Sequence, residues 1–403
     1  MILQKAAERR RWGFSLANYL LNVDWILLAA VLALVGVGMA LIYSATHADP
    51  GLSSPTFWVK SQAVGLAVGL VLMVAVSLID FTRLARWHKY IWAVMVLLLV
   101  ATLILGSERL GARRWIVLPF LDLQASEPAK LMAVVALAAF LADAVELRGR
   151  FRFVIMAVAY LIVPAILIFL EPDLGTALVF VSILFSMLLV WGIRWTHLGV
   201  LVAGGVGAVV AVVRLLPAMG LSILKPYQIQ RLLVFLNPER DTSGDGYQLS
   251  QSKIAVASGM YTGKGYMKGT QTHLNFLPAH HTDFIFAVAG EEFGFLGAMV
   301  ILGLFLVVIW RIVRIAGTSK NLFGSLMAAG IAGIVVFQVF VNVGMTIGIM
   351  PVTGVPLPFV SFGSNSLVVF LTAIGLLQSI HVHSRTALYG GRVKGEVNGK
   401  VTP

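Results

Sequence analysis

A short run of ionisable residues interrupts one of the most apolar parts of the chain. His281, Thr282 and Asp283 stand directly before an apolar segment that begins at Phe284. A carboxylate placed deep at a membrane boundary costs on the order of a few kcal/mol, so such a group is a candidate functional residue. Asp283 could act as a general base, its proton affinity set by partial burial and by His281 or a nearby cation. It could equally be the N-cap of a helix that begins at Phe284.

A second charged pair stands where another apolar segment begins. Glu127 and Lys130 are three residues apart and share one face of the predicted helix. Pro128 suits the first turn of that helix. The pair could shape a cavity in which Lys130 is offered to an anionic head group, or it could be purely structural.

Two further groups of charged residues lie at segment junctions. Arg113 and Arg114 precede Trp115, and guanidinium groups match the oxygens of a pyrophosphate. The alternative is an aromatic and basic anchor at the membrane interface. Glu171 and Asp173 place two carboxylates at a helix junction, where a helix cap is the simpler explanation.

Other patterns carry less information about chemistry. His273, His280, His281 and Asp283 have no fixed ligand spacing, so a dedicated metal site is not expected. The chain has no cysteine, which excludes disulfides and a Cys-based zinc site. The glycines around Lys264 do not have Walker spacing. A divalent cation (Mg²⁺ or Mn²⁺) that assists phosphate chemistry is left open.

The elements that must position these residues are membrane helices. The chain has 403 residues, of which 59% are hydrophobic and 12% charged, whereas a soluble domain carries about 25% charged residues. Runs of roughly 20 apolar residues span a bilayer as helices, because lipid leaves no partner for unpaired backbone groups. The sequence predicts an all-α polytopic membrane protein with about ten transmembrane helices. Their predicted centres are Leu27–Tyr43, Val64–Ile79, Ile91–Gly106, Leu131–Val145, Phe153–Phe169, Leu174–Ile193, Leu198–Leu216, Phe284–Ile309, Phe323–Met345 and Leu367–Ile380.

The net charge is +12, and the distribution of the basic residues predicts the orientation of these helices. Basic residues gather before the first span and in every second connection, which places both termini in the cytoplasm. Because the charges flank helices and form no single basic face, nucleic-acid binding is not expected. We therefore divide the chain into a basic cytoplasmic segment (1–23), one transmembrane domain (24–383) and a cytoplasmic tail (384–403). The first span is expected to be a retained anchor.

Some connections are long enough to have a function of their own. Pro217–Thr282, between the seventh and eighth spans, is predicted to be a long extracytoplasmic loop. Within it, Tyr227–Leu236 and Gln248–Ser258 are predicted interfacial helices. The uncharged stretch Met350–Ser366 is rich in Pro and Gly, so we expect it to be non-helical and to line a cavity. The chain shows no internal repeat, which argues against an inverted-repeat transporter.

Ordered motifs are distributed along nearly the whole chain, from the first span to about His383. They are Gly111–Ile116, Gln124–Lys130, Pro172–Thr176, Gly244–Gln248, Gly263–Tyr266, Gly269–Gln271, His281–Ala287 with Glu291 and Glu292, and Gly348–Phe359. Together they resemble the RodA/FtsW/SpoVE (SEDS) family of bacterial shape, elongation, division and sporulation proteins. Gly269–Gln271 and Phe276–Pro278 favour the RodA branch. The chain departs from the family pattern at Ala125, Pro128 and Ser361–Asn365.

The resemblance implies a peptidoglycan glycosyltransferase of the bacterial cytoplasmic membrane, active in elongation and shape maintenance. Such an enzyme polymerises lipid II at the outer face and works with a class B penicillin-binding transpeptidase. In an inverting displacement, Asp283 would deprotonate the acceptor hydroxyl. Cations would stabilise the leaving pyrophosphate. The predicted substrate-binding residues are Arg114, Glu127, Lys130, Lys60, Asp173, Lys264, Gln271, His281 and Ser361.

Two other functions fit the same residues. A lipid II flippase would also need intramembrane charges and a central cavity, but it would break no bond. A scaffold that only recruits the transpeptidase would need neither substrate nor chemistry.

Overall fold

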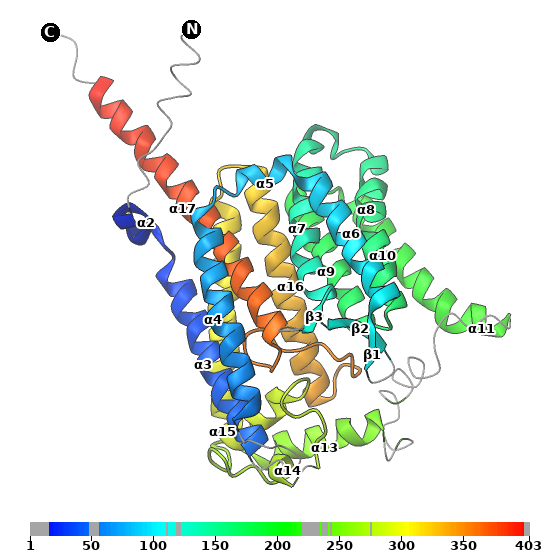
Figure 1. The fold of residues 1–403 in the computed structure, drawn as a ribbon. Coiled ribbons are helices and arrows are strands. Elements are labelled where there is room, and N and C mark those ends of the chain that lie inside the picture. Colours follow the sequence, from blue (N-terminus) through cyan, green and yellow to red (C-terminus); the bar gives the residue numbers. More distant parts are fainter. Residues whose placement is uncertain are drawn as a thin grey trace.

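The computed structural model is a bundle of long helices with a small sheet at one end (Figure 1). It describes residues 16–47, 56–109, 112–117, 122–219, 234, 241, 244–274 and 276–398. The long helices are α3 (Trp25–His47), α4 (Phe57–Leu78), α6 (His88–Leu105), α7 (Ser126–Asp143), α8 (Phe151–Leu170), α9 (Leu174–Trp191), α10 (Trp195–Val210, continued by the π-helical turn η2, Ala211–Leu215), α15 (Ile285–Thr318), α16 (Leu322–Ile347) and α17 (Ser364–Asn398). The shorter helices are α2 (Leu16–Asn22), α5 (Thr82–Arg86), η1 (Val145–Leu147), α11 (Leu216–Ala218), α13 (Asp245–Ser258) and α14 (Thr270–His273).

The long helices confirm the predicted membrane fold. Within the described part of the chain, nine helices are long and apolar enough to cross a membrane. The remaining predicted span, the fourth (Leu131–Val145), corresponds to α7, which has 18 residues but carries Glu127, Lys130 and Asp143. Each predicted segment therefore coincides with one long helix.

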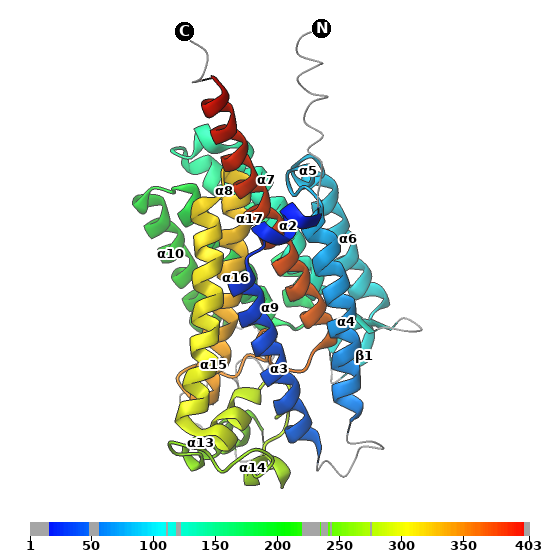
Figure 2. The same ribbon diagram turned by 90° about the vertical axis from the view of Figure 1, so that its left-hand side faces the viewer.

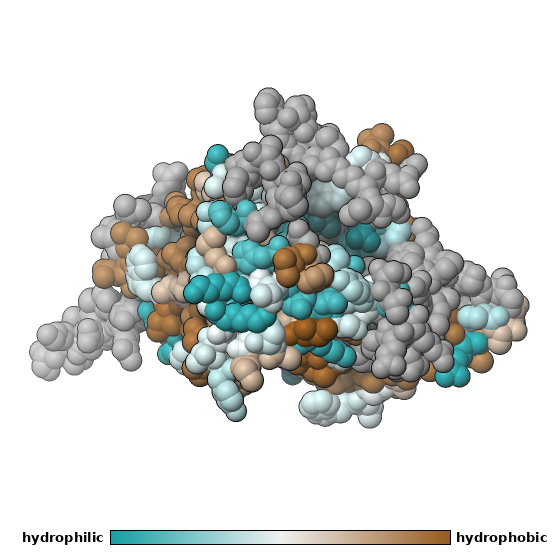
Figure 3. Space-filling model, turned by 90° about the horizontal axis from the view of Figure 1, so that it is seen from below, coloured by the Kyte–Doolittle hydropathy of each residue, from teal (hydrophilic) through white to brown (hydrophobic). Residues whose placement is uncertain are grey.

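The two ends of the bundle differ in structure. The short helices α2 and α5 lie at one end, here called the α5 end, where the last part of α17 also projects (Figures 1 and 2). The sheet, α13 and α14 lie at the opposite end, here called the sheet end. Seen from the sheet end, the described surface shows a concentration of hydrophilic side chains bordered by hydrophobic ones (Figure 3).

The sheet is the element that the all-α prediction missed. Strands β1 (Ser107–Arg109), β2 (Ala112–Val117) and β3 (Asp122–Gln124) form an antiparallel sheet in the order β1-β2-β3. Trp115 pairs with both Ser107 and Gln124. Strands this short have little alternating pattern, and the paired backbone satisfies its polar groups where the chain meets the membrane boundary.

The long loop between α10 and α15 is partly helical. The predicted helix Gln248–Ser258 is confirmed as the C-terminal part of α13. The predicted helix Tyr227–Leu236 lies, apart from Val234, outside the described residues. The non-helical stretch predicted at Met350–Ser366 is confirmed up to Gly363, because α16 ends at Ile347 and α17 already begins at Ser364.

Small residues let α4 and α17 pack closely. A Cβ atom added at Gly65 would lie 2.9 Å from Ser364, and one added at Gly69 would lie 2.6 Å from Leu371. From the other side, a Cβ added at Gly375 would lie 2.5 Å from the carbonyl oxygen of Met73. Small residues at such contacts are typical of membrane helices, whose association depends on van der Waals packing.

A buried ion pair ties three helices together toward the α5 end. The Arg311 guanidinium of α15 donates hydrogen bonds to both carboxylate oxygens of Asp24, at 2.6–3.0 Å. Gln378 of α17 completes the cluster by exchanging two hydrogen bonds with the Asp24 backbone, at 2.9 and 3.0 Å. Arg311 and Asp24 are only 4% and 2% exposed, so neither charge has water as an alternative partner.

This ion pair should be required for stability. Arg311→Leu leaves Asp24 as an unpaired buried charge, which is expected to cost about 3–5 kcal/mol. Thermal melting of the detergent-purified protein measures the loss. Arg314→Leu, one turn away and exposed, is the matched control and should melt like the parent protein. Equal melting temperatures for the two variants would contradict the assigned role of the pair.

Candidate active site

A cavity of about 1950 Å³ opens between α4, α6, α7 and α17. Its wall is apolar along most of its length and includes Val68, Leu72, Val94, Leu131 and Val369. It extends to Trp87 beside α5, so it follows the bundle from one end toward the other. Polar side chains meet at the sheet end of this wall: Arg114, Gln124, Glu127, Asp173, His281, Thr282, Asp283, Thr353 and Asn365.

Asp283 lies in this polar part, in the turn before α15. The N-cap of α15 is Phe284 and its first helical residue is Ile285, so the proposed N-cap role of Asp283 is wrong. A Cβ added at Gly354 would lie 3.6 Å from Oδ2 of Asp283. The carboxylate therefore lies against the non-helical segment that joins α16 to α17.

Three consecutive backbone carbonyl groups at and before Asp283 accept hydrogen bonds from other parts of the chain. The carbonyl oxygens of residues 281–283 accept hydrogen bonds from the Phe362 backbone (3.0 Å), the Ser361 hydroxyl (2.7 Å) and the Asn342 amide (2.9 Å), respectively. Asn342 also donates to the Val355 carbonyl at 2.8 Å. Ser361, predicted to bind substrate, does not line the cavity. Its hydroxyl instead holds the turn that carries Asp283 through the bond to the Thr282 carbonyl. These bonds give the Asp283 backbone a defined place relative to α16 and the α16–α17 segment.

Aromatic contacts orient His281. Its ring stacks on Trp58 of α4 with centroids 4.9 Å apart, and Phe362 packs edge-on against the same indole at 4.7 Å. All three side chains line the cavity. The position of Trp58 links the Asp283 turn to α4, a contact that sequence analysis did not predict.

Arg114 joins β2 to the junction between α8 and α9. Its Nε donates to the carbonyl oxygen of Glu171 at 3.1 Å, and its Nη2 donates to that of Pro172. Asp173 accepts a hydrogen bond from the Thr176 backbone at 3.0 Å, which confirms its predicted capping role. Arg114 and Asp173 both line the cavity as well, so the junction brings a cation and a carboxylate to its polar part.

Glu171 is the second carboxyl of this junction and is almost fully buried. Neither carboxyl oxygen has a hydrogen-bond partner among the described residues. Burial raises the pKa of Glu171 to about 8, the negative charge of Asp173 adds to the rise, and the Arg114 guanidinium opposes it. Glu171 is therefore mainly neutral near pH 7.

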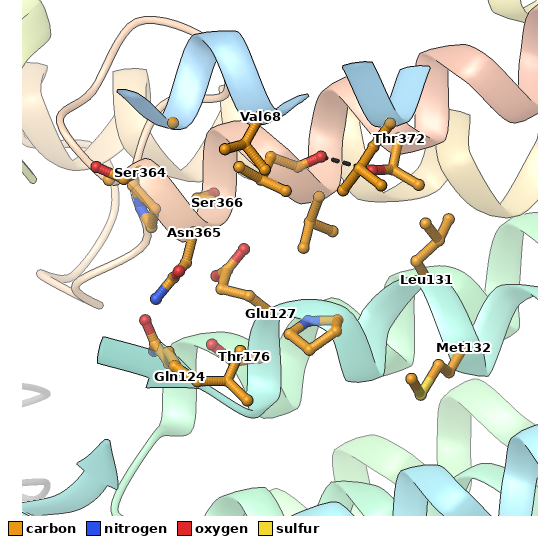
Figure 4. A pocket seen from close by; sticks show the side chains of 18 of the residues that line it. Val68, Gln124, Glu127, Leu131, Met132, Thr176, Ser364, Asn365, Ser366 and Thr372 are labelled. Carbon is orange, nitrogen blue, oxygen red and sulfur yellow. Dashed lines mark hydrogen bonds between the residues drawn. The ribbon is translucent and has the colours of Figure 1, made fainter. Parts of the chain in front are cut away.

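The predicted pair at the start of α7 is confirmed. Lys130 Nζ lies 2.8 Å from Glu127 Oε1, and the two residues are 1% and 4% exposed. Glu127 lines the cavity and points across it toward the start of α17, where Ser364 and Asn365 lie (Figure 4). Lys130 does not line the cavity and lies 5.6 Å from the centre of the Phe370 ring. Its ammonium group is paired with Glu127 and does not reach the cavity, so the predicted contact of Lys130 with an anionic head group is not supported.

Comparison with known proteins decides the family. The profile described as cell cycle protein, which covers FtsW, RodA and SpoVE, matches residues 24–386. The chain belongs to the FtsW/RodA/SpoVE family.

Individual relatives match over most of their length. The chain is 38% identical to the peptidoglycan glycosyltransferase MrdB of Escherichia coli K12, over 90% of this chain and 95% of that protein. It is 35% identical to stage V sporulation protein E of Bacillus subtilis 168, over 90% and 98% of the two chains.

Solved structures of the family share the fold. A chain of a peptidoglycan synthase complex that coordinates polymerization and crosslinking matches with a TM-score of 0.75 and 33% identity, over 90% of this chain and 98% of that one. The crystal structure of the rod shape determining protein RodA of Thermus thermophilus matches with a TM-score of 0.63 and 30% identity, over 89% and 96% of the two chains.

Besides Lys130 and Ser361, three further predicted residues of this FtsW/RodA/SpoVE protein lie away from the cavity wall. Lys60 is exposed on α4, although its neighbour Ser61 lines the cavity. Lys264 Nζ forms an ion pair with Glu291 at 2.7 Å, and the Gln271 backbone N–H donates to the same carboxylate. The structure thus places Lys264 and Gln271 together, but around another buried charge and outside the cavity.

Sequence analysis missed Asn342, although a signal was present. Asn342 is a fully buried amide near the C-terminal end of the apolar helix α16, and polar residues inside membrane spans are usually functional. The side chain of Arg113 lies outside the described part of the structure. Among the described residues, no three His, Asp or Glu side chains gather as metal ligands.

The neutral Glu171 predicts a pH dependence of stability. Its pKa is 4.5 in the unfolded chain and about 8 in the folded protein, so the folded state binds the extra proton between these values. The free energy of unfolding should therefore fall as the pH rises from 5 to 8. Glu171→Gln should flatten this decline, as measured by melting temperatures across the range. A parent protein and a variant with parallel pH profiles would show that Glu171 is already ionised.

The Glu127–Lys130 pair should behave as one unit. Glu127→Ala leaves Lys130 charged in a buried site, at an expected cost of roughly 3–5 kcal/mol, so both yield and activity should fall. Exchanging the two residues should restore folding more than activity, because the carboxylate no longer faces the cavity. Glu146→Ala, on the exposed turn η1 after the same helix, is the control. Normal yield and activity in Glu127→Ala and in Lys130→Ala would place the functional cavity elsewhere.

Proposed function

We propose that this chain is a peptidoglycan glycosyltransferase that polymerises lipid II into glycan strands. The observation that carries the proposal is the cavity: a long apolar wall that ends in a polar cluster with a fixed carboxylate, Asp283. Lipid II has the same division, because it joins a polyprenyl tail to a diphosphate and a sugar. The names of the MrdB and RodA relatives support the same activity.

The dimensions of the cavity suit a lipid tail. Its α4 wall belongs to a helix of 22 residues, which is about 33 Å long at 1.5 Å per residue. This length is close to the roughly 30 Å of hydrocarbon in a bilayer. A polyprenyl chain along this wall would place its diphosphate among Arg114, Glu127 and Asp173 at the sheet end.

The polar part supplies the groups for an inverting displacement. Asp283 takes the proton from the acceptor sugar hydroxyl, whose oxygen attacks the anomeric carbon of the growing chain. The bond from that carbon to the pyrophosphate breaks, and Arg114 stabilises the charge on the leaving group. The three backbone hydrogen bonds around Asp283 hold the base in place before substrate arrives.

Lys130 and a divalent cation have different parts in this proposal. Lys130 neutralises Glu127 and so acts on substrate only through that carboxylate. Mg²⁺ commonly binds through one or two carboxylates together with substrate phosphates. Asp173, which lines the cavity, would supply such a carboxylate, while Asp283 keeps its role as the base. A bound Mg²⁺ would share the neutralisation of the diphosphate with Arg114.

Orientation and partner complete the proposal. The basic residues Arg83, Arg86 and Lys89 lie at the α5 end, so that end faces the cytoplasm and the sheet end faces outward. Single-cysteine labelling after Arg150 and within 244–253 tests this orientation, and labelling of both sites from one side of the membrane would refute it.

A single-span class B transpeptidase is the proposed partner, supported by the synthase complex among the structural matches. Polymerisation should rise when that partner is added.

Purified protein incubated with lipid II separates the candidate functions. Polymer on a gel identifies an enzyme, and movement of lipid II across liposomes without polymer identifies a flippase. If neither polymer nor movement is detected, the protein is a scaffold. Asp283→Asn keeps the size of the side chain and removes its basicity, so it should lower the polymerisation rate by about 10² to 10⁴.

Controls make the result specific to the base. The Asp283→Asn protein should melt normally and still bind lipid II, because the backbone contacts of residue 283 are retained. Asp143→Asn, at the exposed end of α7, should polymerise at the parent rate. Near-normal turnover by Asp283→Asn would eliminate Asp283 as the base while leaving the enzymatic activity established.

A further inference from the structure

Glu291 is a fully buried carboxylate that the proposed mechanism does not use. Its Oε1 accepts hydrogen bonds from Lys264 Nζ at 2.7 Å, the Gln271 backbone at 3.0 Å and Thr270 Oγ1 at 3.2 Å. Its Oε2 accepts one from Thr272 Oγ1 at 3.2 Å. A buried charge is retained only when it is paired and hydrogen-bonded. All of these donors come from one short piece of the long loop between α10 and α15. Glu291 therefore holds that piece in place through its hydrogen bonds.

Backbone hydrogen bonds also join this piece of the loop to α15. The N–H groups of Lys264 and Gly265 donate to the carbonyl oxygens of Glu291 and Glu292, at 3.0 and 2.9 Å. A Cβ added at Gly269 would lie 2.9 Å from Oε2 of Glu291, so a larger residue there would have to displace the carboxylate. Residues 264–272, here called the clamp segment, are therefore joined to α15 by both side-chain and main-chain bonds.

The part of α15 that carries Glu291 is separated from the rest of the helix. Gly294 has φ +65° and breaks the helical geometry, so Ile285–Phe293 forms a short outer piece. At this break, the N–H groups of Phe295 and Leu296 bond to the carbonyl oxygens of Met260 and Tyr261, at 2.8 and 3.1 Å. The loop thus replaces helical hydrogen bonds at the start of the inner part of α15, while its bonds to Glu291 and Glu292 hold the outer piece.

The clamp segment also leads directly to Asp283. The Phe276 N–H donates to the carbonyl oxygen of Gln271 at 3.1 Å, which turns the chain toward the site. Leu277 and Phe284, on the two sides of Asp283 in sequence, are fully buried in one small hydrophobic cluster. Asp283 therefore lies in a stretch that starts at the clamp segment and ends on the outer piece of α15, and Glu291 ties the two ends together.

We infer that Glu291 is a positioning residue for the catalytic base, with Lys264 as its charge partner. The inference rests on the proposed role of Asp283. Glu291 is not in the cavity wall and touches no substrate in this arrangement; it determines where the Asp283 carboxylate lies relative to Gly354 and the polar part of the cavity. Loss of its charge releases the clamp segment and displaces Asp283, without changing the apolar wall that holds the lipid.

Lipid II polymerisation by the full-length protein tests this inference. Glu291→Gln should lower kcat by about 10²-fold, the effect of a displacement of about 1 Å at a catalytic group. The KM for lipid II should change by less than about three-fold, because uniform substrate binding is untouched. Lys264→Met should lower kcat about ten-fold, since the hydroxyl and backbone donors to Glu291 remain. Lys264→Arg should restore most of the loss.

A double-mutant comparison separates positioning from simple destabilisation. In an Asp283→Asn background, Glu291→Gln should change the residual rate by less than about two-fold, because a residue that acts through the base has nothing left to position. Lys268→Met, an exposed lysine in the same clamp segment, is the matched control and should keep the parent rate. Melting temperatures show which variants are folded. If Glu291→Gln does not fold, the half-exposed Lys264 variants carry the same comparison.

Three results would overturn the inference. Equal losses from Glu291→Gln in the parent and Asp283→Asn backgrounds would mean that Glu291 acts independently of the base. A raised KM with unchanged kcat would make it a substrate-binding residue. Parent-like kcat in both Glu291→Gln and Lys264→Met would make the cluster dispensable for positioning. Failure of the base assignment itself is recognised separately, because Asp283→Asn alone would then polymerise normally.

Discussion

Hydrocarbon offers no hydrogen bonds, so every charge and every irregular stretch of backbone within this bundle must find its partner inside the protein. In the described part of the chain, three buried carboxylates are paired with Lys or Arg: Asp24 with Arg311, Glu127 with Lys130, and Glu291 with Lys264. Each pair also joins segments or defines a wall. The first ties α3 to α15, the second shapes the cavity, and the third fastens the extended loop to α15.

The same constraint explains why the site lies where two non-helical segments meet. The turn before α15 and the segment between α16 and α17 both expose backbone carbonyls, and each supplies donors or acceptors to the other. Asn342 contributes the remaining donor from within α16. The groups that satisfy the backbone are thus also the groups that fix Asp283, so stability and catalytic geometry depend on the same hydrogen bonds.

Much of the candidate site follows from residue type and spacing. Glu127 and Lys130 had to share a helix face because they are three residues apart, and Asp173 stands where an N-cap is expected. Residues whose partners are distant in sequence were harder to place. Lys264 fits a phosphate-binding role by charge alone, but its contact with Glu291 across the loop gives it a different one. Lys130 and Glu127 were identified together, yet which of them faces the cavity depends on how α7 is turned against α17.

The amino-acid sequence by itself determined the membrane fold, the positions of the long helices and the identity of the acidic and basic candidates, because apolar length, charge and local spacing are properties of neighbouring residues. The tertiary structure alone decided three matters. It brought Trp58, Ser361 and Gly354 to the turn that carries Asp283, it turned Glu127 toward the cavity, and it broke α15 at Gly294, where the loop supplies hydrogen-bond acceptors. These contacts join residues from different helices, and packing and the pairing of buried polar groups select them only when the whole bundle has formed.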